Sequence, residues 1–407
     1  MAASIFQEPN TYVPANQRLI FGIDTSTLIT TAFRFVVVVK ENGTQIGKYY
    51  LSPNPEDVAF FDLGELTRKR LEVDNRPYSG GGTLFEYQSN YFSRSLGNVA
   101  SYTVEVGEWD GTTETTNQDN RTVYLIGGRE QLSAGLHPDF SNYYATAITK
   151  KVWLTDYPVT GSYIELTAQD ETEGFAALIT RSTVSNATAI SYAVTTSSGT
   201  TTTTVTLNTT NGAQLPTATS PVNGFITYVA LMPVNVAAAG ISLTGWTSYT
   251  VQPIIEATLT PVGRALRVTK DCKTYKTDPV ELAWSNSKGG WDYATFEGKL
   301  LTTVTTQNKP YKKALGTWAA SVFESYSFDS ETAYFHKDGE EAYQLTGRFT
   351  QTELEVFKNL VLAKKAFIKL GQWLPVLIDT ASYQVRTDNL QIAEVVFNVK
   401  LAQTLRV

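Results

Sequence analysis

The sequence predicts an all-β protein, built from several antiparallel β-sandwich or barrel-like domains with a few short helices. Threonine, valine, tyrosine and phenylalanine recur in short runs, and glycine, proline and asparagine turns separate these runs. Charged residues make up only 18% of the 407 residues, against about 25% in an average soluble protein. This low charge indicates either a surface covered by neighbouring subunits or a neutral surface rich in threonine and serine.

The length of the chain predicts several domains, which we place at residues 1–150, 151–265 and 266–407. A net charge of −6 without a basic block argues against a nucleic-acid groove. The single cysteine excludes an intramolecular disulfide framework. We expect no membrane insertion, and the opening MAASIFQEP lacks the features of a secretory signal. That absence counts against a third reading, a bacterial surface or periplasmic β protein.

The first predicted element is a hairpin over residues 33–53, which read FRFVVVVKENGTQIGKYYLSP. The aromatic and valine residues at odd positions from 33 to 39 share one face of an extended chain. Asn42-Gly43 fits a type I′ turn between the two strands. Val36 and Val38 make the second face apolar as well. Another layer of this chain or another subunit is therefore expected to cover that face.

The rest of the first domain predicts antiparallel strands with one short helix. Asp62 is placed to cap a helix in the segment FFDLGELTRKRLE. Residues 102–106 alternate apolar and polar side chains as a strand does. The polar run at residues 112–120 predicts a loop, and RTVYLIGG after it predicts the returning strand.

The second domain predicts about seven short strands, a number that suits a β-sandwich. Ile164 and Leu166 alternate with Tyr163 and Glu165 in one of them. The threonine run at residues 200–204 leads directly into an apolar stretch with strand-compatible spacing. We interpret it as a strand with one side facing solvent or a subunit, and not as a linker.

The third domain contains the clearest helix of the chain. Thr350 and Glu353 have the spacing of a capping box, and Leu354, Phe357 and Val361 form an apolar stripe. Three strands follow the helix. The last of them places four apolar side chains on one face, namely Val395, Phe397, Val399 and Leu401.

The sequence offers little for catalysis, so we expect no enzyme and no cofactor or metal. His137 and His336 have no G-x-S-x-G nucleophile elbow nearby, and with one cysteine they do not supply a zinc site. Cys272 has lysine neighbours that favour a thiolate, although a structural thiol is the simpler interpretation. The glycine triplet at residues 80–82 lacks the Lys-Ser/Thr pair of a phosphate loop.

Two carbohydrate-directed alternatives remain open. In the first, Glu105, Glu108 and Asp110 act as the acid and base of a glycoside hydrolase beside a tryptophan. In the second, aromatic rings form a platform for a host-surface glycan in a receptor- or carbohydrate-binding module. The platform residues would be Trp109, Tyr143, Tyr144 and Trp246. Aromatic side chains fill β cores and interfaces more often than they bind sugars.

Several segments of the chain carry a family resemblance. They are FRFVVVVKENG, FFDLGEL, YTVEVGEWDG, KKVWLTDYP, CKTYKTDPVELAWSNSKGGWDYATFEGKL and WLPVLIDTASYQVRTDNLQIAEVVFNVKLA. Their order resembles virion structural proteins of tailed phages, notably those infecting Bacteroidetes. The pattern of that group is matched by Trp284, Asn286, Gly289, Gly290, Trp291, Asp292 and Phe296, with Ser285 intervening. The resemblance covers most of the chain and is weakest at residues 190–220.

The matched motifs are structural, so the resemblance implies a building block and not an activity. It implies a non-enzymatic part of a phage tail, baseplate or collar that forms a ring or layer with copies of itself and other virion proteins. Such a protein is made in the bacterial host cytoplasm and ends in the virion. The interface residues that we expect are Val36, Val38, Trp291, Val395, Phe397 and Val399.

Overall fold

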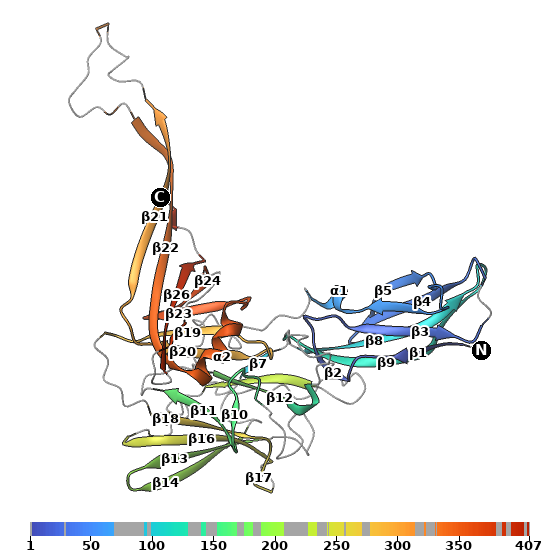
Figure 1. Cartoon of the computed structure of the whole chain (residues 1–407), viewed down its shortest axis with the longest axis horizontal. Coiled ribbons are helices and arrows are strands. Elements are labelled where there is room, and N and C mark those ends of the chain that lie inside the picture. The colour runs from blue at the N-terminus through green and yellow to red at the C-terminus, as the bar shows by residue number, and fades with distance from the viewer. Residues whose placement is uncertain are drawn as a thin grey trace. The chain divides into compact units, whose positions relative to one another are not determined.

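The computed structural model describes residues 2–27, 30–68, 93–95, 99–128, 140–143, 153–168, 175–181, 189–206, 227–233, 242, 244–255, 258–270, 277–313, 321–322, 330, 332–379, 385–387, 392–402 and 405–406. Strands dominate these residues, which confirms the all-β prediction (Figure 1). The chain divides into two compact units. The first is Met1–Lys273 with Ala283–Tyr293, and the second is Thr274–Leu282 with Ala294–Val407.

A sandwich of two sheets occupies the beginning of the first unit, coloured blue to cyan in Figure 1. One sheet has the order β1–β3–β6 and the other has the order β2–β9–β8–β4–β5. Apolar side chains of both sheets share one buried core. The strands are β1 Ala3–Gln7, β2 Tyr12–Pro14, β3 Ile20–Thr25, β4 Arg34–Glu41, β5 Thr44–Leu51, β6 Ala59–Asp62, β8 Val99–Trp109 and β9 Glu114–Ile126.

The opening hairpin is confirmed as β4 and β5. Asn42 and Gly43 have φ angles of 49° and 84°, as a type I′ turn requires. The odd-numbered side chains of β4 lie in the core of the sandwich. On the other face, Val36 is paired with Tyr50, and Val38 lies between Lys48 of β5 and Glu105 of β8.

Part of the polar run at residues 112–120 is a strand and not the predicted loop. Only the short turn before Glu114 is a loop, and β9 then pairs with β8 along most of its length. Its outer half is exposed, so backbone pairing sets its structure without an apolar pattern. Asp62 is also not the N-cap of α1 Gly64–Thr67: the N-cap is Leu63, and the Asp62 carboxylate accepts a hydrogen bond from the Gly64 N–H.

Two further sheets follow in the first unit. The larger has the order β10–β11–β18–β16–β13–β14, with β17 beside β16, and the smaller has the order β12–β15–β7. The threonine run lies in the exposed edge strand β14, as predicted. The elements are β7 Ser93–Ser95, the 3-10 helix η1 Phe140–Tyr143, β10 Val159–Thr160, β11 Tyr163–Ala168, β12 Phe175–Arg181, β13 Ala189–Thr196, β14 Gly199–Thr206, β15 Thr227–Pro233, β16 Trp246–Ile255, β17 Thr260–Pro261 and β18 Ala265–Lys270.

Within the predicted all-β fold of antiparallel domains, two strand pairs are parallel. β11 pairs with β18 in parallel, and β2 pairs with β9 in parallel. Parallel neighbours need a long connection. Between β11 and β18 this connection contains β13, β14, β16 and β17, which belong to the same sheet. The predicted boundary at residue 265 falls at the start of β18, which pairs with β11 and β16.

A nine-stranded sheet contains the strands of the second unit, with the order β20–β19–β23–β24–β26–β22–β21, β25 beside β26, and β27 beside β22. The division between the units runs through the β19–β20 hairpin. The elements are β19 Val280–Ser285, β20 Trp291–Phe296, β21 Leu301–Lys312, β22 Thr332–Thr350, α2 Gln351–Leu360, β23 Ala366–Leu370, β24 Gln372–Ile378, β25 Val385–Thr387, β26 Ile392–Leu401 and β27 Leu405–Arg406.

The helix α2 begins at the predicted capping box. Thr350 accepts a hydrogen bond from the Glu353 N–H, and the Glu353 carboxylate accepts one from the Thr350 N–H. Phe357 of α2 packs among Phe296, Phe349 and Phe397, with ring centroids 4.6–6.0 Å apart. This aromatic cluster fixes the helix on the sheet. No helix within the described residues has the length and apolar character needed to cross a membrane.

Candidate assembly surface

The carboxylates considered for a glycosidase do not form a facing pair. Glu105 forms an ion pair with Lys40 on the outer face of β8. Glu108 instead accepts hydrogen bonds from the hydroxyl groups of Thr25, in β3 of the opposite sheet, and Thr27. The two glutamate side chains therefore lie on opposite faces of their sheet. A glycoside hydrolase needs an acid and a base that face each other across a cleft, and these two do not.

Asp110 forms the turn between β8 and β9. Its carboxylate accepts hydrogen bonds from the N–H groups of Thr113, at 2.7 Å, and Thr112, at 2.8 Å. These bonds hold the pKa of Asp110 below its ordinary value. A general acid needs the opposite shift, so Asp110 stabilises the turn.

The predicted aromatic platform is not assembled. Tyr143 and Trp246 are buried in separate elements, η1 and β16, with 8% and 2% of their surface exposed. Tyr144 lies outside the described residues. Trp109 is half-buried and packs edge-to-face against the exposed ring of Tyr50, 6.2 Å away. Of the four, only Trp109 is described with a partly open ring.

The six predicted interface side chains are buried by this chain itself. Val36, Val38 and Trp291 are at most 5% exposed. Val395, Phe397 and Val399 are fully covered within the second unit. They are therefore not on the surface of this conformation. Contact with another subunit through these side chains stays a prediction that their burial disfavours.

The Gly-Gly-Trp-Asp motif makes a turn that approaches another segment closely. Gly289 has a φ of 84°, and a Cβ there would lie 2.9 Å from the Gly127 backbone. A Cβ on Gly128 would lie 2.6 Å from the Ser287 carbonyl oxygen. A Cβ at either position would prevent this approach, which gives Gly289 and Gly128 a packing role.

Behind this turn lies a buried carboxyl group, that of Asp292. It accepts hydrogen bonds from the Thr155 hydroxyl at 2.5 Å and the Asp156 N–H at 2.9 Å. Asp156 in turn accepts from the N–H and the hydroxyl of Ser287. Burial, reinforced by the neighbouring Asp156, raises the pKa of Asp292 to about 8. Asp292 therefore cross-links two segments of the first unit, and its raised pKa favours the protonated form.

Neither carboxyl site has the composition of a metal centre. Across the described part of the chain, no three His, Cys, Asp or Glu side chains gather closely enough to hold an ion. Cys272 and His137 lie outside the described residues, and the side chain of His336 is not described.

The most exposed element of the second unit is the β21–β22 ribbon, which we define as β21 with the part of β22 paired to it. All twelve residues of β21 are exposed. β21 is the terminal strand of its sheet, and it pairs with β22 from Leu301 to Lys312. On its other side, β22 pairs with β27 at Asp338 and Gly339 and with β26 from Ala342 onward. The ribbon therefore extends beyond the body of the sheet, as Figure 1 shows.

The chemistry of the ribbon changes along its length. Residues 301–308, LTTVTTQN, carry no charge and include Leu301 and Val304, which are 43% and 58% exposed. Lys309, Pro310 and Lys312 follow. Lysine and proline on an edge strand oppose pairing with a further strand, so the strand edge suited to pairing is limited to residues 301–308.

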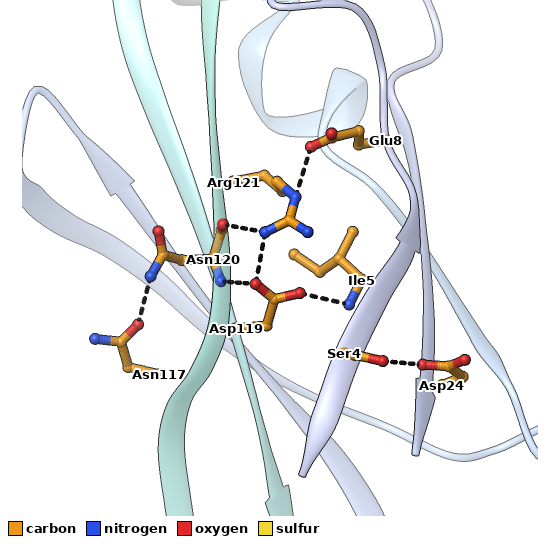
Figure 2. Close-up of polar contacts among 8 residues, drawn as sticks. All are labelled: Ser4, Ile5, Glu8, Asp24, Asn117, Asp119, Asn120 and Arg121. Carbon is orange, nitrogen blue, oxygen red and sulfur yellow. Dashed lines mark hydrogen bonds and ion pairs between the residues drawn. The ribbon is translucent and has the colours of Figure 1, made fainter. Parts of the chain in front are cut away.

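A second surface of interest is the attachment of β1 to β9, drawn in Figure 2. β1 pairs with β3 on one side. On the other side, the Ala3 N–H donates to the Gln118 side chain at 2.7 Å, and the Ile5 N–H donates to Asp119 at 2.9 Å. Side chains of β9 thus accept the backbone hydrogen bonds that a neighbouring strand would otherwise accept. Gln118 and Asp119 lie in the segment 112–120, which the sequence predicted as a loop. The prediction therefore gave them no role as acceptors for a strand.

No family model matches the chain, and no curated protein matches it.

Proposed function

We propose that this chain is a non-enzymatic structural subunit of a tailed-phage virion, located in the tail, baseplate or collar. It assembles with copies of itself and with other virion proteins into a ring or layer. The observation that carries this proposal is the β21–β22 ribbon, an exposed terminal strand of twelve residues. The sequence resemblance to virion proteins supports the same function.

The ribbon is suited to addition of a further strand. Opposite residues 301–308, β22 already pairs in part with β26 and β27 on its other side, so β21 is the open edge of the sheet there. A further strand along β21 would satisfy the open backbone groups of that edge. The uncharged segment 301–308 offers eight residues for that pairing. The exposed Leu301 and Val304 side chains lie on opposite faces of β21, and side chains of the added strand would partly cover each of them. Lys309 and Pro310 would end it, which limits uncontrolled growth.

The first experiment measures the mass of the purified protein by light scattering over a concentration series, with negative-stain imaging of the same samples. We expect rings or discrete multimers. A stable monomer at every concentration would contradict assembly through copies of this chain.

Matched variants then test the role of the ribbon. The double variant Leu301→Lys and Val304→Lys places charges on its uncharged segment and is expected to abolish the multimers. The control is Leu362→Lys with Leu377→Lys, which changes two apolar residues that are 50% and 61% exposed elsewhere in the second unit. Multimers of the same size and yield in the first variant, in the control and in the unchanged protein would exclude the ribbon.

A second candidate function, a glycan-binding tail module, is favoured by one observation. Tyr50 is 51% exposed beside Trp109, and Glu114 binds both the Tyr50 hydroxyl, at 2.7 Å, and Lys48. Tyrosine and tryptophan rings, which combine an apolar face with a polar group, are enriched at binding interfaces. Binding to a panel of host glycans should then fall on Tyr50→Ala and persist on the control Tyr311→Ala, an exposed ribbon tyrosine.

A further inference from the structure

β1 lies between β3 and two polar side chains of β9, and we call this strand position the groove (Figure 2). The backbone of β3 forms one wall, with Ser4 paired to Asp24. Gln118 and Asp119 of β9 form the other wall and accept hydrogen bonds from the Ala3 and Ile5 N–H groups. The backbone of β1 is therefore hydrogen-bonded along both edges, by the strand β3 on one side and by side chains of β9 on the other.

The groove also recognises the side chains of β1. Ala3 and Ile5 point into the core and are 1% and 7% exposed. Phe6 lies over Gly22, where a Cβ would come within 2.6 Å of its ring. A small, an aliphatic and an aromatic residue are thus accommodated in a fixed order. The sequence of β1 itself fits this order.

An ionic contact closes the end of the groove. Arg121 binds Glu8 at 3.0 Å and Asp119 at 2.6 Å (Figure 2). Partial burial acts to raise the pKa of Asp119, but hydrogen bonds from the Ile5 and Asn120 N–H groups and from Arg121 outweigh it and lower the pKa. Asp119 is therefore an anion at neutral pH and a strong acceptor for the β1 backbone.

The anchorage of β1 is nevertheless small. The strand has five residues, and only Ala3 and Ile5 bury apolar side chains. Residues 8–11 connect it to β2, and Pro9 in this connection disfavours a helical conformation. A short strand with two buried side chains can open locally without unfolding of the sandwich.

We infer that β1 is an exchangeable strand, and that the groove between β3 and β9 accepts β1 of a neighbouring copy in place of its own. Every contact of β1 in the groove is the same after exchange, because the incoming strand has the same sequence. The swapped form is then favoured by a high local concentration of copies. The inference rests on the proposed function, because assembly in a virion supplies the high local concentration of copies. The exchanged strand would be a contact between copies that does not involve the ribbon.

Cross-linking between chains tests the exchange. In a Cys272→Ser background, one chain carries Ser4→Cys and a second carries Asp24→Cys, at positions that face each other across β1 and β3. Paired positions on adjacent strands suit a disulfide. After mixing of the folded full-length chains and mild oxidation, we expect a disulfide-linked dimer whose yield rises with protein concentration.

The control uses a pair of strands that should not exchange. Thr103→Cys and Thr122→Cys face each other across β8 and β9, with hydroxyl oxygens 2.9 Å apart. Mixing these two chains should give no dimer. A dimer of equal yield in this control would overturn the inference, since the whole sandwich would then be opening.

A double variant decides the remaining case. Ser4→Cys and Asp24→Cys in one chain should form a disulfide within that chain. If it does, and the mixed single variants stay monomeric at high concentration, β1 does not exchange. The same mixing is repeated in chains that also carry Leu301→Lys and Val304→Lys. If the larger multimers are lost and the cross-linked dimer still forms, assembly depends on the ribbon and the exchange of β1 does not.

Discussion

The β8–β9 hairpin and the β21–β22 ribbon are both long pairs of antiparallel strands, yet they differ in what surrounds them. β8 is buried along most of its length, because one face lies in the sandwich core and its partners β4 and β9 flank it. β21 is exposed at all twelve positions and has β22 on one side. The two strand pairs share antiparallel pairing and have opposite environments.

This difference shows that strand pairing alone does not stabilise a hairpin. Backbone hydrogen bonds replace bonds to water and give a small net gain, whereas removal of apolar area from water gives most of the stability. The β8–β9 hairpin obtains that burial within its own chain. The ribbon would obtain it from a neighbouring subunit, so its stability in the isolated chain should be low.

The largest effect is expected at a third hairpin, β19–β20, whose turn is buried. Its Asp292 has a pKa of about 8, above the unfolded value, so the folded state binds a proton that the unfolded state has lost. The free energy of unfolding should therefore fall as pH rises from about 4 to about 8, by on the order of several kcal/mol. Denaturant titrations at successive pH values measure this slope.

The variant Asp292→Asn should remove most of that slope, because it no longer titrates. Asp110→Asn, in the exposed β8–β9 turn, is the control and should leave the slope in place above pH 5, since its pKa lies below the ordinary value. An unchanged slope in Asp292→Asn would show that another group titrates.

The second effect compares the same substitution in the two hairpins. Val104 is fully buried on β8, and Val304 is 58% exposed on β21. Val104→Ala leaves a cavity in the core and should lower the free energy of unfolding by roughly 2–4 kcal/mol. Val304→Ala should change it by less than about 0.5 kcal/mol. Urea denaturation of the monomer measures both. Equal losses would mean that the ribbon is packed against its own chain.

A third, smaller effect concerns close approach within the β8–β9 hairpin. A Cβ at Gly107 would lie 2.0 Å from the Thr115 carbonyl oxygen, beside the β-bulge. Gly107→Ala must move the backbone and should lower the free energy of unfolding by about 1–3 kcal/mol. Thr302→Ala on the ribbon, the control, should be nearly neutral. A neutral Gly107→Ala would indicate that the bulge rearranges freely.

The smallest effect is local and appears in acid. The folded-state pKa of Asp119 is lowered, so its contribution is present above pH 4 and is lost as pH falls through that lowered pKa. Protection of the Ile5 amide from hydrogen exchange should therefore fall in acid before that of amides in β8. Asp119→Asn should weaken this protection at neutral pH and remove its dependence on pH. Equal loss at Ile5 and in β8 would contradict a separable β1.

Much of the fold could be predicted because alternating polarity and turn chemistry act locally. Asn42-Gly43 fixes a type I′ turn by its φ angles, and Thr350 with Glu353 begins a helix by satisfying backbone groups within one turn. The alternation in β26 also holds, since Val395 and Phe397 lie on the buried face. Each of these features depends on residues a few positions apart.

The candidate surfaces were less accessible to sequence reasoning. The outer half of β9 carries polar side chains, so nothing in the pattern separated it from a loop. The acceptors Gln118 and Asp119 serve a strand more than one hundred positions away in the sequence. The β-branched run LTTVTTQN was a signal for β21, but exposure of the whole strand cannot be inferred from alternation.

The sequence by itself determined the all-β class, the opening hairpin, the capped helix and the apolar faces of the strands, because these follow from local backbone preference and side-chain period. Tertiary structure alone decided what covers each face. On the second face of β4, Val36 and Val38 are buried next to paired residues of β5 and β8, and Trp291 is buried beside Asp292, whose pKa burial raises. Burial of a strand face depends on contacts between segments that are far apart in the sequence. Only the tertiary structure therefore shows which faces stay exposed and can bind a partner.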